Sequence, residues 1–199
     1  RDQQKVRHLS RIFQVLREVS DTIHGNERTE DVFARLCTRI TLEPGYQNMR
    51  IVLFDTNGNV TRVYHAGLEE QMGRFLSYLQ AGNRTSCYKK ALQSRCGPVI
   101  CAPDETCVSC PLYSGHHDAH TLTVRLEHAG TVFGIVSVTL EPEYAGDPDE
   151  QAMVQDVARE ISYALHHFLL QEEHKEMEHL IGTNKKLDIL NTITRHDIR

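Results

Sequence analysis

The pattern of apolar and polar positions divides the chain into a helical start, a strand-rich middle and a long helical end. In residues 3–24 and 29–40, apolar side chains recur every three or four positions, which predicts two amphipathic helices. Gly25-Asn26 separates the two segments and is typical of a helix end. We expect the stripe of the second helix to lie in the core, and it consists of Val32, Phe33, Leu36 and Ile40.

The middle of the chain predicts a sheet. Short β-rich segments alternate with turn residues, such as Asn57-Gly58 and Ala129-Gly130, which favour hairpins. The predicted strands cover residues 49–54, 60–65, 98–101, 121–126 and 132–140, and helices are predicted over 68–79 and 88–93. This order favours an α+β fold with an antiparallel sheet of five to six strands and helices mostly on one face.

The end of the chain, residues 149–198, predicts one long helix of about 75 Å at 1.5 Å per residue. Two heptad series run through its distal half and indicate a coiled coil, and hence a homodimer that the helix over 3–24 would join. The alternative is a helix that lies on its own domain. The two series are Leu170, Met177, Asn184, Asn191 and Glu173, Leu180, Leu187, Thr194.

The charge and composition exclude some classes of protein. The net charge is -5, from 22 Lys+Arg and 27 Asp+Glu, and no basic stripe indicates nucleic-acid binding. A membrane-spanning helix needs about 20 apolar residues, and no such stretch is present in the sequence. We expect a cytoplasmic protein with reduced thiols, because no secretory signal is visible and six cysteines are too few for a disulfide scaffold. The first residue is Arg1, so we expect a piece of a longer protein.

Five of the six cysteines lie within 24 residues. Cys107 and Cys110 form a C-x-x-C turn in a polar loop, a spacing that lets two thiolates bind one metal ion. Further ligands would be Cys87 and Cys101, and the substitutes are Cys96, His116, His117 and His120. Zinc, an iron–sulfur cluster, a reversible disulfide and a structural role all remain open. Cys37 stands apart on a helix, where we expect a core residue.

The last ten residues carry a motif, Leu190-Asn-Thr-Ile-Thr-Arg-His-Asp-Ile-Arg199. This segment resembles the phosphoacceptor box of sensor histidine kinases, in the form common in methanogenic archaea. The resemblance implies that His196 is the phosphorylated residue and Asp197 the general base. It also implies an ATP-binding domain in cis and a response regulator as partner. The chain has no Gly-rich phosphate loop, so we expect no enzyme activity from this fragment alone.

The upstream part is similar to GAF domains. The resemblance rests on Thr121-Leu-Thr-Val-Arg-Leu-Glu-His-Ala-Gly-Thr-Val-Phe-Gly-Ile-Val-Ser-Val138, which is similar to their closing hairpin. Cys107-Val-Ser-Cys-Pro-Leu112 also matches a subset of GAF-like sensors. The resemblance implies a GAF-like sensor over residues 1–168, with an unidentified small ligand, and a signalling helix with a truncated phosphoacceptor segment over 169–199.

Three functions follow as hypotheses. The first is the sensory module of a two-component histidine kinase, which couples a small ligand, a metal or a redox state to phosphorylation of His196 in a dimer. The second is a thiol or methionine-sulfoxide oxidoreductase that uses Cys107 with Cys110, or Cys87 with Cys96. The third is a zinc-stabilised structural adaptor.

Overall fold

The computed structural model describes residues 29–94, 97–103, 107, 110–113 and 119–196, together with Val6, Ser10, Gln14 and Arg17. For Thr29, Glu30 and residues 183–196 it describes the backbone alone. The four isolated positions are helical, and the rest of the helix predicted over 3–24 lies outside the described residues. The chain forms two compact units, Arg1–Ala164 and Leu165–Arg199.

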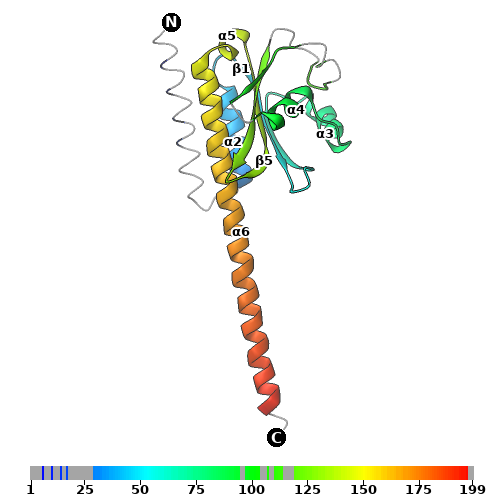
Figure 1. Ribbon diagram of the computed structural model, residues 1–199, viewed down its shortest axis with the longest axis vertical. Coiled ribbons are helices and arrows are strands. Elements are labelled where there is room, and N and C mark those ends of the chain that lie inside the picture. The colour runs from blue at the N-terminus through cyan, green and yellow to red at the C-terminus, as the bar shows by residue number, and fades with distance from the viewer. Residues whose placement is uncertain are drawn as a thin grey trace. The chain divides into compact units, whose positions relative to one another are not determined.

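The first unit is built on a five-stranded antiparallel sheet with strand order β2-β1-β5-β4-β3 (Figure 1). This confirms the predicted fold class. The strands are β1 (Tyr46–Phe54), β2 (Val60–Ala66), β3 (Val99–Cys101), β4 (His120–His128) and β5 (Thr131–Leu140). The helices are α2 (Thr29–Thr41), α3 (Met72–Gln80), α4 (Ser86–Gln93), α5 (Pro142–Ala145) and α6 (Pro148–His196).

The hairpin between β4 and β5 turns at the predicted residues. Ala129 has φ 50° and Gly130 has φ 81°, so both lie in the left-handed region that a two-residue turn requires. Next to the turn, β5 runs so close to β1 that a Cβ on Gly134 would lie 2.0 Å from the carbonyl oxygen of Val52. The sequence therefore fixes both the turn and the close approach of the two central strands.

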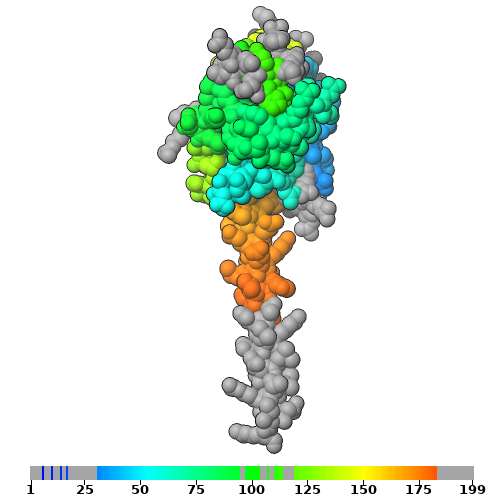
Figure 2. Space-filling model, turned by 90° about the vertical axis from the view of Figure 1, so that its right-hand side faces the viewer, coloured from blue at the N-terminus to red at the C-terminus, as the bar shows by residue number. Residues whose placement is uncertain are grey.

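Helices cover both faces of the sheet, so the prediction of helices mostly on one face is wrong. Figure 1 shows α2 and residues 148–164 of α6 on one face and α3 and α4 on the other, and Figure 2 looks onto the side that α3 and α4 cover. The reason is that α3 and α4 are amphipathic and also bury apolar side chains against the sheet. Those buried residues are Met72, Phe75 and Leu79 of α3, and Cys87, Tyr88 and Ala91 of α4.

The core between the sheet and α2 is mainly apolar. Met49 and Ile51 of β1 are fully buried there, and Phe33 of α2 meets Tyr64 of β2 edge to face at 5.5 Å. The predicted core stripe of α2 is confirmed, since its four residues are at most 1% exposed, and Cys37 is fully buried as predicted.

Residues 148–164 of α6 contact the sheet unit through polar and aromatic side chains as well as through buried apolar ones. The hydroxyl of Tyr46, at the start of β1, donates a 2.6 Å hydrogen bond to the buried carboxylate of Glu150. Near the other end, Tyr163 meets the ring of His128 edge to face at 5.6 Å.

In the second unit, residues 165–196 form the remainder of α6. Several large apolar side chains are exposed there, among them the heptad residues Leu170, Met177 and Leu180. Such a series is typical of a helix that pairs with another helix. Within the described part of the chain, no helix combines the length and the apolar character that crossing a membrane requires.

Candidate functional site

The candidate site lies on the face of the sheet under α3 and α4, where the central strands present polar side chains. Strand register places Arg50, Ser137 and Thr123 in one row, and Asn48, Thr139 and Thr121 in the next. We call these six residues the polar floor. Five of them are at most 7% exposed, and Thr121 is half-buried. A buried polar surface of this kind is costly unless its groups find partners.

Most partners lie within the floor itself. The hydroxyls of Thr123 and Ser137 are 3.1 Å apart, and those of Thr121 and Thr139 are also 3.1 Å apart. Arg50 Nη1 donates to Asn48 Oδ1 at 3.0 Å and to Thr139 Oγ1 at 3.4 Å. The floor is thus a hydrogen-bonded network across β1, β5 and β4.

Arg50 brings a positive charge to this network. Its side chain is 4% exposed and stacks near the ring of Phe75, and no described carboxylate contacts it. Its Nε has no hydrogen-bond partner among the described residues, and the hydroxyl of the fully buried Tyr88 is close enough to the guanidinium to influence its pKa. Burial is the largest influence on the Arg50 pKa and lowers it, but nearby Tyr88 and Cys87 raise it, so that the pKa lies above its ordinary value. The guanidinium is therefore a buried cation that faces phenol and thiol groups.

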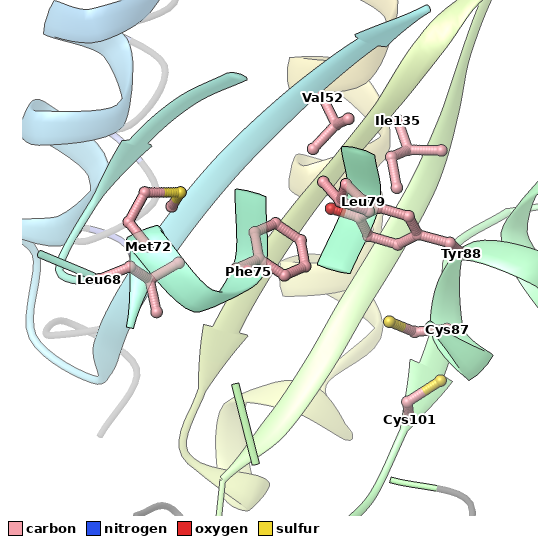
Figure 3. Close-up of a cluster of buried hydrophobic side chains, with 9 residues drawn as sticks. All are labelled: Val52, Leu68, Met72, Phe75, Leu79, Cys87, Tyr88, Cys101 and Ile135. Carbon is pink, nitrogen blue, oxygen red and sulfur yellow. The ribbon is translucent and has the colours of Figure 1, made fainter. Parts of the chain in front are cut away.

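Cys87 and Cys101 meet above the floor (Figure 3). Cys87 is in the first turn of α4, and Cys101 is the last residue of β3, paired with Thr121 in the sheet. The two thiols are hydrogen-bonded, and both side chains are buried, at 8% and 9% exposed. The hydroxyl of Thr85 lies 3.0 Å from Cys87 Sγ, and the hydroxyl of Thr123 also bonds to this sulfur.

The electrostatic surroundings of the two thiols differ. The hydrogen bond from Cys101 is the largest influence on Cys87 and, with Arg50, lowers the pKa of Cys87 below its ordinary value despite burial. The same hydrogen bond raises the pKa of Cys101, and burial adds to that effect. Within the pair, Cys87 is therefore the thiol whose deprotonated form is favoured, next to Arg50.

The predicted C-x-x-C turn is formed. The backbone N–H of Cys110 donates to the carbonyl of Cys107 at 2.8 Å, and both side chains are half-buried. Burial raises the pKa of Cys110, and Cys87 and Arg50 are close enough to influence it. Cys107 in turn influences Cys101. The structure thus brings together the four cysteines that the sequence analysis selected, and all four are free thiols.

These cysteines do not form a metal site in the described geometry. Where the structure describes the chain, no group of three or more His, Cys, Asp or Glu side chains is placed to hold a metal ion. The thiol of Cys87 instead forms hydrogen bonds with Cys101 and with the hydroxyls of Thr85 and Thr123. Among the substitutes, His120 begins β4, and Cys96, His116 and His117 lie outside the described residues. Zinc or an iron–sulfur cluster stays a prediction.

The proposed phosphoacceptor lies at the other end of the chain. His196 is the last residue of α6, its side chain is not described, and Asp197 lies outside the described residues. Their roles therefore stay predictions from the sequence resemblance.

Sequence reasoning missed Arg50, Thr123, Thr85 and Tyr88 as members of the site. One signal was present for Arg50, which interrupts the apolar strand segment between Met49 and Ile51. A charged residue at an inward position of a central strand needs a partner or a ligand. The other three are ordinary residues in sequence and become significant only when the sheet places them around Cys87.

Comparison with known proteins bears on the fold. No family model matches the sequence, and no curated protein matches it. Among solved structures, the chain is similar to the GAF domain of a phosphoenolpyruvate-protein phosphotransferase from Coxiella burnetii, with TM-score 0.60 and 12% identity over 83% of this chain and 98% of that one. It is also similar to the phycoerythrobilin-bound GAF domain of a cyanobacterial phytochrome, with TM-score 0.59 and 14% identity over 81% and 97%.

A third similar structure is an enzyme. It is the free methionine-R-sulfoxide reductase from Neisseria meningitidis in complex with its substrate, with TM-score 0.53 and 11% identity over 79% of this chain and 90% of that one. At such identities the likeness shows the fold alone, and the chain has a GAF fold. This confirms the fold that the sequence resemblance implied.

Proposed function

We propose that this chain is the sensory module of a two-component histidine kinase. In this proposal the GAF unit detects a change at the cluster of Cys87, Cys101, Cys107 and Cys110, and α6 transmits the change to His196. The supporting observation is the course of α6, which begins with buried residues such as Met153 and Ile161 and runs to His196 as one helix. A packing change that moves the start of a continuous helix also acts on its end.

The chemistry at His196 follows from the residue types. A neutral imidazole nitrogen attacks the γ-phosphorus of ATP, the N–P bond forms, and the bond to the leaving ADP oxygen breaks. Asp197 would accept the imidazole proton. The ATP comes from the ATP-binding domain that the proposal requires, and the phosphoryl group then passes to an aspartate of a response regulator.

A homodimer supplies the second helix in this proposal. Exposed Leu170, Met177 and Leu180 would pack against their counterparts of a second copy in a two-stranded coiled coil. In this proposal the coiled coil has two packings of similar energy, and the state of the GAF unit shifts the populations of the two.

The test is phosphoryl labelling of the chain joined to that ATP-binding domain. With ATP labelled on its γ-phosphate, we expect a label that is stable to base and labile to acid, and that His196→Gln removes. His174→Gln is the matched control, because this exposed histidine of the same helix pairs among the described residues with Glu178, at 3.5 Å. Labelling that survives His196→Gln would disprove the assignment of the phosphoacceptor.

A second candidate function is a thiol-dependent reductase. The hydrogen-bonded thiols of Cys87 and Cys101 favour it, since a nucleophilic and a resolving thiol at one site are the minimum that such chemistry requires. The assay is turnover of free methionine sulfoxide with a dithiol reductant. Turnover that Cys87→Ser abolishes would make this the primary function.

The metal prediction has its own measurement. Anaerobic purification followed by metal analysis and a visible spectrum separates iron with colour, zinc without colour, and neither. A stoichiometric metal that Cys107→Ser removes would establish a metal site at the C-x-x-C turn.

A further inference from the structure

Two of the clustered thiols are positioned to react with each other. Cys87 lies in the first turn of α4, and Cys101 is the last residue of β3. The two cysteines are close in sequence but belong to different elements. Figure 3 shows their sulfur atoms next to each other, beside the buried ring of Tyr88. A hydrogen bond joins the two thiols.

The surroundings make the two sulfur atoms unequal. Arg50 is a buried cation that no described carboxylate contacts, and Cys87 is among the groups that influence it most. The hydroxyls of Thr85 and Thr123 both reach Cys87. Cys87 also lies at the positive end of the α4 dipole. These groups favour negative charge on Cys87. For Cys101, the hydrogen bond with Cys87 and burial raise the pKa, and the charge of Lys90 offsets them only in part.

The two thiols are largely buried, but each keeps a small surface that is accessible to solvent. Cys87 is 8% exposed and Cys101 is 9% exposed, so a molecule as small as a hydroperoxide needs little movement of the chain to reach them. Cys37, in contrast, is a completely buried residue of α2, on the opposite side of the sheet. It provides an internal reference for a thiol without access or activation.

We propose that Cys87 and Cys101 are a peroxide-oxidised thiol pair in which Cys87 reacts first and Cys101 resolves. The Cys87 sulfur attacks one peroxide oxygen, the O–O bond breaks, and the leaving oxygen takes a proton to become water or an alcohol. The Cys101 sulfur then attacks Cys87-SOH, the S–O bond breaks, and a second water leaves. The peroxide gains two electrons, the two thiols lose two, and a dithiol reductant reverses the change.

Disulfide formation would alter the charge of the site. The Cys87 sulfur can then no longer carry a negative charge beside Arg50, and the guanidinium is left buried without a counter-charge among the described residues. Arg50 and the floor must rearrange or admit another anion. The step from this rearrangement to α6 rests on the proposed function, whereas the disulfide itself does not.

The test uses the reduced 199-residue chain and hydrogen peroxide as the oxidant. After one equivalent of peroxide, we expect a loss of two hydrogen masses and a crosslink that fragmentation assigns to Cys87 and Cys101. Cys101→Ser should instead accumulate a sulfenic acid at Cys87 that dimedone traps. Cys37→Ser is the control and should leave the crosslink unchanged, because Cys37 is fully buried in α2 and is not part of the cluster. A crosslink between Cys107 and Cys110, or no oxidation of Cys87, overturns the proposal.

Two substitutions at Arg50 test the role of the cation. Arg50→Met should slow the reaction with peroxide on the order of tenfold at neutral pH, and Arg50→Lys should restore most of the rate. Equal rates in both variants and the parent chain would contradict the role of the charge. Circular dichroism of Arg50→Met and Arg50→Lys establishes that both are folded.

The same oxidation separates this inference from the proposed function. If the crosslink forms but leaves phosphoryl labelling of His196 unchanged, the thiol pair stands and its link to the kinase fails. If His196 is labelled and no crosslink forms, the kinase module stands and the thiol pair fails.

Discussion

The hydrogen bond between Tyr46 and Glu150 offers a quantitative test of how α6 is held to the sheet. The donor and acceptor oxygens are 2.6 Å apart, a length typical of a hydroxyl that donates to a carboxylate. Tyr46 is 6% exposed and Glu150 is 1% exposed, so water does not replace the bond easily when it is lost. Burial, followed by the charge of Glu150, raises the pKa of Tyr46 above its ordinary value, so the phenol keeps its proton at neutral pH.

Tyr46→Phe removes the donor and leaves the ring. A hydrogen bond to a charged group contributes about 1.5–3 kcal/mol, and we expect a loss of this size in the free energy of unfolding. For a chain of this length, about 2–4 °C of Tm corresponds to each kcal/mol, which gives a decrease of about 3–12 °C. Urea unfolding followed by circular dichroism measures the free energy, and a thermal scan measures Tm.

Tyr78→Phe is the matched control for this substitution. Its hydroxyl reaches the carbonyl of Arg84 only at 3.5 Å, so we expect a loss below about 0.5 kcal/mol. The double variant Tyr46→Phe/Glu150→Leu replaces both polar partners and should lose less than the sum of the two single variants. If Tyr46→Phe lies within about 0.5 kcal/mol of the parent chain, the hydrogen bond does not anchor α6 as argued.

Three further predictions concern the GAF unit. Gly67→Ala should destabilise this unit more than Gly58→Ala. Both glycines have positive φ (75° and 81°), which costs about 1–2 kcal/mol in Ala. At Gly67 the new Cβ would also lie 2.3 Å from the carbonyl oxygen of Gln47, whereas at Gly58 it would meet nothing within 4 Å. Equal losses in urea unfolding would contradict this. An NMR titration should find the pKa of Asp55 below its usual value, because the Asn59 side chain and backbone donate to it, and Asn59→Ala should move it back up. Since the folded pKa is the lower one, the stability from this turn is present above the unfolded pKa and is lost as pH falls through the folded pKa. Cys37, whose pKa burial raises to about 12, should resist iodoacetamide at neutral pH until urea unfolds the chain, and rapid alkylation of the native chain would show that its burial is overstated.

Local patterns predicted much of the fold because their causes are local. The turn at Ala129-Gly130 needs two residues of positive φ, and the stripe of α2 needs only helical spacing. The length of α6 follows from the scarcity of helix breakers after Pro148, since no further proline and a single glycine, Gly182, lie within it. These features depend on residues within a few positions of one another.

The candidate site could be predicted only in part, because its chemistry depends on contacts between distant segments. The sequence selected Cys87 and Cys101 as members of one cluster, but the pairing of their thiols needs β3 at the sheet edge and α4 above it. Alternation in β4 and β5 marks Thr123 and Ser137 as residues of a solvated face. Both are fully buried, because α3 and α4 cover that face, and no pattern in the strands themselves reveals the cover.

The contrast between the two faces of the sheet has a consequence for how the chain folds. Along β1, Asn48 and Arg50 belong to the polar floor, and Met49 and Ile51 belong to the apolar face under α2. A slip of β1 by one residue against β5 would exchange these sets, placing a guanidinium among apolar side chains and apolar side chains beside the thiols. Misaligned sheets are therefore penalised on both sides at once. The polar floor thus helps to select a single strand alignment during folding.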